Sequence, residues 1–359
     1  MKEVIIITGG GTLGHVLPII PIIKELQKEH IFIYIGTKKG IEKKYLLDND
    51  LNDLFRKLYF LDMDGVNRKH LLKNIIVFLK YLGLKKKIKQ IYKEYKPVLV
   101  IGMGGYISGV AIHIAQMKKI KTIIHEQNIV LGLANKLVYK KANNLLLSFP
   151  IDSLKGKNIK IIGNPRYTEV LLNYMPKDNY NNLLIIGGSL GSKKINEIIL
   201  NNIEKLKDIN ITLITGNKYY NENIIKIQNL MTIYPNLMIY PFVNELVAMM
   251  SKASIIISRS GATTINEIMA LRKCSILIPS PNVTDNHQLK NALYLKDYNA
   301  CLMIEEKDLN IDVLLKNIFL LYNNYNYKKE MENNIKTIIT NNPKEDFIKA
   351  IREIIWISM

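Results

Sequence analysis

Two glycine-rich turns in this sequence have the composition of phosphate-binding loops. Residues Thr8–His15 read TGGGTLGH and residues Gly187–Ser192 read GGSLGS, and each follows an all-apolar segment and precedes an amphipathic one. Glycine lets the backbone turn sharply beside a phosphate, and the N-terminus of a following helix offers unpaired N–H groups to an anion. One such turn is weak evidence. Two turns at corresponding points of two halves indicate paired nucleotide-binding domains with a ligand held between them.

His15 is a candidate general base. It comes one residue after Gly14, where the first turn leads into an expected helix over residues 16–26. At the carboxyl edge of a sheet its imidazole would project toward a substrate. The positive end of a helix favours the neutral imidazole, as a general base near pH 7 requires. A polar residue that merely caps the helix is the alternative.

Four polar residues, His125–Asn128 (HEQN), follow the apolar segment 121–124. Side chains of this kind at the end of a strand indicate a site, because α/β proteins bind ligands at that edge. A polar loop cap is the alternative. A His-Glu pair without a second spaced histidine is not the helical zinc motif, so we expect no metal here.

A third glycine-lined turn, Gly104–Gly109 (GGYISG), follows the apolar segment 98–103 and precedes an expected helix over residues 110–117. It could hold an anionic acceptor, or it could only allow a helix to pack closely on a strand. Its composition alone leaves both possibilities open.

In the second half, Ser258–Glu267 (SRSGATTINE) directly follows an apolar strand. Hydroxyl and backbone N–H groups from Ser260 to Thr264 would face a diphosphate at a helix N-terminus. Glu267 could accept hydrogen bonds from two ribose hydroxyls, or it could be a surface residue of the helix. Asp285–Gln288 (DNHQ) suits the hydroxyls of a sugar, and equally suits a solvated loop.

Residues 68–93 form a basic segment with apolar residues at helical spacing. A basic amphipathic helix can lie on an anionic membrane. A helix that faces the core with a solvated lysine rim is the alternative. The net charge of +19 also points to an anionic partner, although only six of the 50 basic residues are arginine and no nucleic-acid-binding motif is present.

Short β-branched segments alternate with helical ones along the 359 residues. This pattern predicts an α/β fold with parallel sheets covered on both faces, and the length favours two domains. We place the domains at residues 1–163 and 164–340, with a hinge at the Gly-Asn-Pro break of residues 163–165. A last segment, 341–359, holds a helix that we expect to pack back on the N-terminal domain. No signal peptide or membrane-spanning segment is apparent, and two cysteines are too few for a disulfide framework.

Taken together, these motifs resemble the MurG family, the transferases that add N-acetylglucosamine to lipid I in peptidoglycan synthesis. The segments that carry the resemblance span residues 8–292 in family order: TGGGTLGHVLP, GMGGYISG, HEQNIVLGLANK, GNP, GGSLGSKKIN, SRSGATTINE and HQLKNA. The resemblance implies a GT-B fold, in which two Rossmann-like domains face each other across a cleft.

The resemblance also implies roles for individual residues. His15 would be the catalytic base, with Glu126 as a supporting carboxylate. The acceptor, lipid I, would lie against Gly104, Gly105, Tyr106 and Ser108. The residues that would bind UDP-N-acetylglucosamine are Thr12, Leu13, Gly14, Asn128, Arg166, Ser189, Val243, Ala262, Thr263, Thr264, Ile265, Asn266, Glu267 and Gln288.

The implied activity is an inverting transfer of N-acetylglucosamine to the C4 hydroxyl of the muramoyl sugar, which forms lipid II without a metal or other cofactor. The implied location is the cytoplasmic face of the cell membrane, bound peripherally through the basic helix near residues 70–87. Proteins of cell-wall synthesis and division would be partners, and nucleic acid would not.

Two positions depart from the family pattern. Leu13 stands where the family has Gly or Ala, so the loop near the acceptor diphosphate is more crowded. Tyr167 occupies the usual place of an arginine, and Arg166 comes one residue earlier. The alternatives are another UDP-sugar enzyme of the same fold, a non-catalytic scaffold and a nicotinamide dehydrogenase. The last is disfavoured because Gly36–Lys38, with no acidic residue, ends the second strand.

Overall fold

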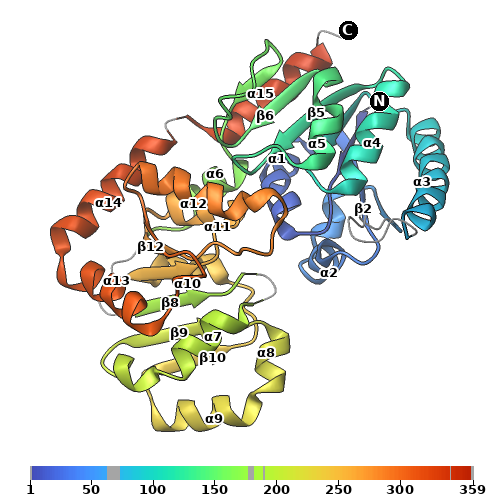
Figure 1. Ribbon diagram of the computed structural model, residues 1–359. Coiled ribbons are helices and arrows are strands. Elements are labelled where there is room, and N and C mark those ends of the chain that lie inside the picture. The colour runs from blue at the N-terminus through green and yellow to red at the C-terminus, as the bar shows by residue number, and fades with distance from the viewer. Residues whose placement is uncertain (1, 63–72, 177–181, 189–190, 340, 357–359) are drawn as a thin grey trace. The chain divides into compact units, whose positions relative to one another are not determined.

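The computed structural model describes residues 2–62, 73–176, 182–188, 191–339 and 341–356, with the backbone alone for residues 73–80. The chain divides into two compact units (Figure 1). Unit 1 comprises residues 1–166 and 341–359, and unit 2 comprises residues 167–340. The predicted boundary at 163–164 lies three residues before this division, and the last helix belongs to unit 1.

Unit 1 alternates strands and helices. Its elements are β1 (Glu3–Thr8), η1 (Leu13–His15), η2 (Leu17–Ile19), α1 (Ile20–Leu26), β2 (His30–Thr37), α2 (Ile41–Asp48), η3 (Leu51–Leu54), β3 (Lys57–Leu61), α3 (Lys73–Tyr95), β4 (Leu99–Gly102), α4 (Tyr106–Met117), β5 (Lys121–Glu126), α5 (Leu133–Val138), η4 (Tyr139–Lys141), β6 (Asn144–Leu147), β7 (Ile159–Ile161) and α15 (Pro343–Trp356), where η denotes a 3₁₀ helix.

Helix α6 (Pro165–Asn173) begins at the boundary between the units. The elements of unit 2 are β8 (Asn182–Ile186), α7 (Lys193–Leu200), η5 (Ile203–Leu206), β9 (Asn210–Ile214), α8 (Asn217–Glu222), α9 (Ile224–Ile233), β10 (Leu237–Tyr240), α10 (Leu246–Lys252), β11 (Ile255–Ser258), α11 (Ala262–Ala270), β12 (Cys274–Leu277), η6 (Thr284–Asn286), α12 (His287–Asp297), β13 (Leu302–Met303), α13 (Ile311–Asn323) and α14 (Tyr325–Ile338).

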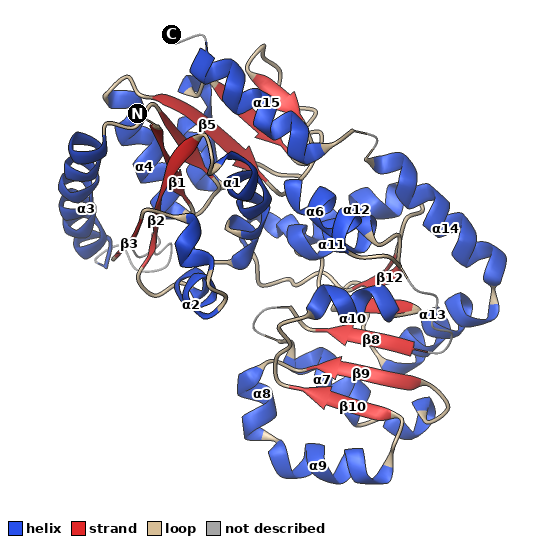
Figure 2. Ribbon diagram, turned by 180° about the vertical axis from the view of Figure 1, so that it is seen from behind, coloured by secondary structure: helices blue, strands red, loops and turns tan. Residues whose placement is uncertain are grey.

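Both described sheets are parallel throughout, which confirms the predicted fold class. The seven-stranded sheet of unit 1 has the order β3-β2-β1-β4-β5-β6-β7, and the six-stranded sheet of unit 2 has the order β10-β9-β8-β11-β12-β13 (Figure 2). In each unit the first strand lies in the interior of its sheet, and the order in which successive strands are added reverses beside it. That is the point where α/β sheets place their ligands.

Alternating residues of the unit 1 strands build a core on each face of the sheet. Ile5 and Ile7 of β1 pack in one core with α1 and α15, whereas Ile6 packs in the other core with α3 and α4. Successive side chains of a strand point to opposite faces, so a continuously apolar strand requires helices on both sides. Phe347 of α15 is fully buried in the first core.

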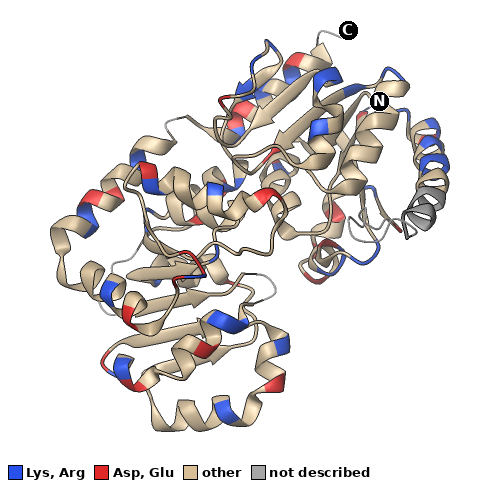
Figure 3. Ribbon diagram, viewed as in Figure 1, with Lys and Arg blue, Asp and Glu red and all other residues tan. Residues whose placement is uncertain are grey.

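The basic helix α3 is described in part. Leu84, Ile88 and Ile91 are buried against the second core, so the second half of the helix faces the protein with its apolar side. Lys86, Lys87 and Lys89 of this half are exposed, and Figure 3 colours its lysines blue. Residues 68–72 of the predicted basic segment lie outside the described residues, and residues 73–80 are described by their backbone alone. Among the helices that the structure describes, none is both long enough and apolar enough to cross a bilayer.

Candidate active site

Polar residues gather at the carboxyl edge of the unit 1 sheet. Strands β2, β1, β4 and β5 are neighbours, and they end at Thr37, Thr8, Gly102 and Glu126 respectively. The first glycine turn follows β1, the GGYISG turn follows β4, and the HEQN segment lies at the end of β5. The structure therefore brings together three motifs that are distant in the sequence.

The first glycine turn is tightly enclosed. The N–H of Gly9 donates to the carbonyl of Ile35 at 3.3 Å, and the N–H of Gly10 donates to the carbonyl of Gly104 at 3.3 Å. A Cβ on Gly10 would lie 2.7 Å from a carboxylate oxygen of Glu42. The prediction of one helix over residues 16–26 was wrong in its first part, because the chain forms the 3₁₀ helices η1 and η2 before α1 begins.

His15 is the last residue of η1. Its Nδ1 lies 2.7 Å from the carbonyl oxygen of Gly10. Because a carbonyl only accepts, Nδ1 carries the proton in the neutral ring, and Nε2 is the nitrogen that can accept one. A Cβ on Gly104 would lie 2.7 Å from Nε2, so only glycine allows the imidazole to lie against this turn. Short 3₁₀ geometry, rather than a long helix, positions the histidine.

The GGYISG turn packs against the first turn. Gly104 and Gly105 have φ values of +114° and +84°, and a Cβ on Gly105 would lie 2.5 Å from the carbonyl oxygen of Gly10. Tyr106, the first residue of α4, is 37% exposed. Ser108 is fully buried, and its hydroxyl lies against Gly102 of β4. The turn thus presents glycines and a tyrosine at the edge, with the serine in the interior.

Glu126 organises the loop that follows β5. The predicted strand end at residue 124 was too early, since β5 includes His125 and Glu126 and both are buried. The carboxylate of Glu126 accepts from the N–H of Gly132 at 2.8 Å, from Nδ2 of Asn135 at 2.9 Å, and from the backbone and side-chain nitrogens of Asn128 at 3.2 Å. With these donors, Glu126 fixes the position of Asn128.

His125 lies in a buried network behind the site. Its Nε2 is 3.2 Å from both the carbonyl of Gly163 and the hydroxyl of Ser148, and its Nδ1 is 3.1 Å from Nε2 of Gln127. Gln127 also donates to the carbonyl of Met103 at 2.7 Å, which links HEQN to the GGYISG turn. Burial lowers the pKa of His125 to about 4. Across the described residues, no group of three or more His, Cys, Asp and Glu side chains could hold a metal ion.

The carboxyl edge of the unit 2 sheet carries the second glycine turn. Ser192 caps α7 and accepts from the N–H of Ile195 at 3.4 Å. Gly191 has φ +75°, and a Cβ there would lie 2.0 Å from the carbonyl oxygen of Thr215. Ser189 lies outside the described residues. The turn leads into a regular helix, and the positive end of a helix favours an anion.

Helix α11 provides a second N-terminus at this edge. Gly261 caps it, and Ala262, Thr263 and Thr264 form its first turn. Ile265 and Asn266 are fully buried, and Nδ2 of Asn266 donates to the carbonyl of Ala262 at 2.8 Å. The side chains of these two residues therefore lie within unit 2, although both were predicted to bind the nucleotide sugar.

Three further predicted residues of unit 2 belong to helices and turns at its edge. Glu267 of α11 is 4% exposed. Gln288 of α12 accepts from the N–H of Ser280 at 2.9 Å, and its carbonyl accepts from the hydroxyl of Ser260 at 2.7 Å. Gln288 thus joins two loops of the edge. Val243 is half-buried in the turn between β10 and α10.

Arg259 is a residue of this edge that the sequence interpretation missed. Its guanidinium donates to the hydroxyl of Ser192 at 2.7 Å and to the carbonyl of Ile278 at 3.1 Å, and it forms an ion pair with Glu306. Five fixed donors let one arginine join several loops. The sequence feature that could have identified Arg259 is its position in SRSG, as a charged residue that closely follows an apolar strand.

Arg166 and Tyr167 lie in the first turn of α6. The N–H of Arg166 is bonded to Oδ1 of Asn164 at 3.0 Å, and the Arg166 side chain is half-buried. Tyr167 is buried, and desolvation raises the pKa of its hydroxyl. At this departure from the family pattern, the tyrosine is buried and the neighbouring arginine is half-buried.

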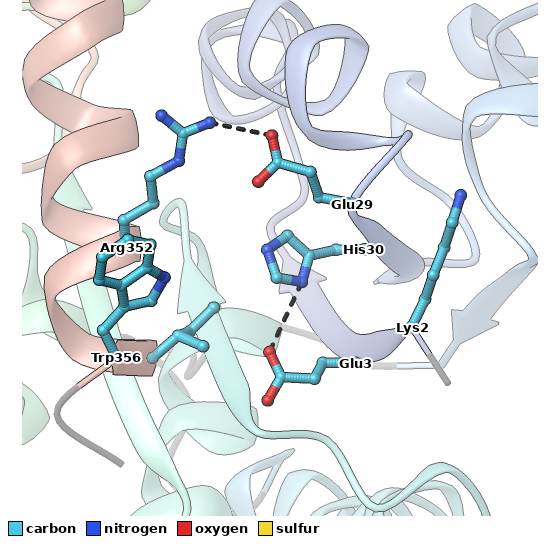
Figure 4. Close-up of a pocket in the computed structure, with 7 residues that line it drawn as sticks. Lys2, Glu3, Glu29, His30, Arg352 and Trp356 are labelled. Atoms are coloured by element: carbon cyan, nitrogen blue, oxygen red, sulfur yellow. Dashed lines mark hydrogen bonds and ion pairs between the residues drawn. The ribbon is translucent and has the colours of Figure 1, made fainter. Parts of the chain in front are cut away.

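A pocket at the opposite edge of the unit 1 sheet has no part in this arrangement. It is lined by Glu3 and His30, the first residues of β1 and β2, together with Lys2, Glu29, Arg352, Ile355 and Trp356 (Figure 4). Arg352 pairs with Glu29 at 2.9 Å, and Nδ1 of His30 lies 3.8 Å from Glu3. Because it is formed where the strands begin, this pocket is separate from the glycine turns.

Two family models cover most of the chain. The glycosyltransferase family 28 N-terminal domain matches residues 5–147, and the glycosyltransferase family 28 C-terminal domain matches residues 182–351. Both matches include the glycine turn of their half.

Similar proteins span nearly the whole chain. A protein of Lactobacillus helveticus (strain DPC 4571), named UDP-N-acetylglucosamine--N-acetylmuramyl-(pentapeptide) pyrophosphoryl-undecaprenol N-acetylglucosamine transferase, is 36% identical, and the match covers 98% of this chain and 99% of that protein. A protein of the same name from Bacillus subtilis (strain 168) is 34% identical over 93% of this chain and 94% of its own length.

Among solved structures, MurG of Acinetobacter baumannii matches with a TM-score of 0.76 and 26% identity, covering 98% of this chain and all of that one. A UDP-GlcNAc 2-epimerase from Neisseria meningitidis has a TM-score of 0.69 at 16% identity, covering 98% of this chain and all of that one, and it shows the fold alone. With its two parallel α/β domains and relatives above 30% identity over their full length, the chain belongs to the MurG family of N-acetylglucosamine transferases.

Proposed function

We propose that this protein transfers N-acetylglucosamine from UDP-N-acetylglucosamine to lipid I, forming lipid II. The observation that carries the proposal is the full-length similarity to relatives named for this transfer, at 34–36% identity. All seven motifs that the sequence shares with the family lie within the matched length.

The nucleotide sugar is proposed to bind at the edge of unit 2. Its diphosphate would lie at the N-termini of α7 and α11, near Ser189 and Ala262–Thr264. Glu267 would accept from the ribose hydroxyls, and the backbone of Val243 would contact uracil. Fixed N–H dipoles stabilise the negative charge that develops on the leaving UDP. Ile265 and Asn266, with their buried side chains, would contribute through their backbone alone.

The chemical step is proposed to use His15. Its Nε2 accepts the proton of the muramoyl C4 hydroxyl while that oxygen forms a bond to the anomeric carbon of the donor. The bond from that carbon to the diphosphate breaks, and UDP leaves with the electron pair. Nδ1–H, held by the carbonyl of Gly10, keeps Nε2 in the accepting tautomer. Attack opposite to the leaving group inverts the anomeric centre.

Further substrate contacts are proposed for residues of each unit. We assign contacts with the N-acetylglucosamine to Thr12, Leu13 and Gly14 of the first turn and to Gln288 of unit 2. Asn128, whose position Glu126 fixes, would also contact this sugar. This assigns Glu126 a supporting role, because its oxygens already accept several hydrogen bonds. Gly104, Gly105 and Tyr106 would contact the acceptor. Ser108 would support their turn from the interior, and Arg166 would stand in for the family arginine.

We propose peripheral binding at the cytoplasmic face of the cell membrane, through the basic helix near residues 70–87. The relatives are named for an undecaprenol-linked acceptor, which a membrane would hold. Lys85, Lys86 and Lys87 add positive charge on the described part of α3 (Figure 3). Anionic lipid attracts such a segment with about 1 kcal/mol for each lysine near the surface.

One assay tests the transfer directly. UDP-N-acetylglucosamine is incubated with a lipid I analogue, and UDP release is compared with a control that lacks acceptor. Release that depends on acceptor, together with the disaccharide product, is expected. Release without acceptor, or conversion of the donor to its 2-epimer, would contradict the proposal and indicate another enzyme of the same fold.

A further inference from the structure

Glu42 is a buried carboxylate at the start of α2 that contacts the first glycine turn. The side chain is 0% exposed. One oxygen, Oε2, accepts from the N–H of Gly11 at 3.1 Å. The other, Oε1, accepts from the N–H of Thr37 at 2.9 Å and also from its hydroxyl. Three donors, one from the first glycine turn and two from the last residue of β2, therefore converge on one carboxylate.

The local structure stabilises the negative charge of Glu42. Glu42 is the second residue of α2, where the helix dipole favours an anion. Hydrogen bonds to an ionised acceptor are also stronger than neutral ones. A Cβ on Gly40, which caps the helix, would lie 1.9 Å from Oε2, so glycine there leaves room for the carboxylate to fold back.

The glycine turn lies between Glu42 and His15. A Cβ on Gly10 would be 2.7 Å from Oε1 of Glu42, and the carbonyl of the same residue accepts from Nδ1 of His15. The next residue, Gly11, is exposed and has φ +89°, and a Cβ placed on it would meet no described atom within 4 Å. No packing contact with a described residue holds Gly11 on the side where a Cβ would lie, so the hydrogen bond from its N–H to Glu42 fixes this part of the turn.

We propose that Glu42 is a positioning residue for catalysis. It fixes Gly11, and with it the carbonyl of Gly10 that orients the imidazole of His15. This inference rests on the proposed function for the role of His15. A shift of about 1 Å in a catalytic group can reduce the rate about 100-fold.

Glu42→Gln is the direct test, because an amide has only one oxygen. When that oxygen accepts from the two donors of Thr37, the amide NH₂ faces the N–H of Gly11 and the bond to the turn is lost. We expect kcat to fall about 10- to 100-fold. The Kd for UDP should stay within about twofold, since the proposed nucleotide contacts lie in unit 2. Thr37→Val, which loses one bond to Oε1 and keeps Gly11 bound, should change kcat less than about threefold.

Amide hydrogen exchange gives a readout that does not depend on activity. In the wild-type protein we expect the exposed Gly11 amide to exchange at least about tenfold more slowly than an unprotected amide, and Glu42→Gln should remove this protection. Exchange at the unprotected rate in the wild type would overturn the inference. So would a Glu42→Gln variant with wild-type kcat, or one with reduced kcat and unchanged protection of Gly11.

A second variant serves if Glu42→Gln does not fold. Glu42→Asp keeps the charge and withdraws the carboxylate by one methylene, so it should also release Gly11 and lower kcat. Wild-type turnover in Glu42→Asp with an unprotected Gly11 would overturn the inference. If the wild-type protein itself releases no UDP in the presence of acceptor, the proposed function fails, while exchange at Gly11 still decides whether Glu42 holds the turn.

Discussion

The two glycine turns have similar sequences but lead into different kinds of helix. In unit 2 the turn leads into the regular helix α7, capped by Ser192, so it presents backbone N–H groups. In unit 1 the turn leads into the short 3₁₀ helix η1, and its glycines contact Glu42, Gly104 and the ring of His15. The difference teaches that one turn leads to the positive end of a regular helix, whereas the other fixes the orientation of a histidine side chain.

The largest effect should come from the histidine that the unit 1 turn orients. We expect His15→Ala to lower kcat by about 10²- to 10⁴-fold, the usual contribution of a general base. The Kd for UDP, measured by calorimetry, should not change. If His15→Ala turns over near the wild-type rate with intact substrate binding, His15 is not the general base, and the proposed functional difference between the two turns is contradicted.

A methyl group on the unit 2 turn should affect binding instead. Gly191→Ala places a Cβ 2.0 Å from the carbonyl of Thr215 at φ +75°, so the turn has to move. Strain of this kind costs about 1–3 kcal/mol. We expect UDP to bind at least about tenfold more weakly, with a lower melting temperature. Wild-type UDP affinity would show that the nucleotide does not use this turn.

Replacing the arginine that joins the unit 2 loops should produce a smaller loss. Arg259→Lys keeps the charge but cannot reach Ser192, Ile278 and Glu306 together. We expect the Kd for UDP to rise about three- to tenfold in calorimetry, while kcat at saturating donor stays within about twofold. An unchanged Kd would mean that the loops hold their positions without the guanidinium.

Acid should weaken the network behind the unit 1 turn. Burial lowers the pKa of His125 to about 4, below its unfolded value of 6.5. The unfolded chain therefore binds more protons as the pH falls from about 6.5 to about 4, and stability is lost over that range, by on the order of 3 kcal/mol. The free energy of unfolding, measured with urea, should differ less between pH 7 and pH 5 in His125→Gln than in the wild-type protein. Equal pH dependence in both proteins would contradict this.

Membrane binding should be the weakest and the most salt-sensitive effect. The proposed basic helix belongs to unit 1, so vesicles with anionic lipid should bind the protein, and binding should weaken as salt rises. Neutral vesicles are the control. Replacing Lys85, Lys86 and Lys87 by Gln should lower the fraction of protein bound to vesicles in a flotation assay. The affinity for UDP should stay at the wild-type value. Binding indifferent to lipid charge and salt would contradict the proposal.

The sequence predicted the architecture well, because its signals are local. The apolar segments 98–103 and 121–124, for example, overlap the observed strands β4 and β5, since a continuously apolar segment suits a strand that is covered on both faces. The family and its transfer reaction were also confirmed, by the two family models and by relatives named for that reaction. The roles of the individual site residues stay predictions.

The sequence is less informative where contacts distant along the chain decide the structure. Ser108 and Asn266 were predicted to contact substrates, and the structure buries both side chains fully. Their proposed roles stay predictions. The first turn continues as 3₁₀ geometry where its backbone is held by Gly104 and Glu42. Glu42 itself gave no local signal, because in the sequence it is one acidic residue at the start of an ordinary helix.

The sequence by itself determined the two parallel α/β domains, the family, and the motifs that reach the carboxyl edges of the sheets. Apolar periodicity and glycine positions depend on neighbours a few residues away, so the sequence is sufficient for them. Only the tertiary structure decided which polar side chains are buried and which atoms they bond. A buried carboxylate such as Glu42 or Glu126 requires hydrogen-bond donors, and folding brings those donors from loops that are distant along the chain.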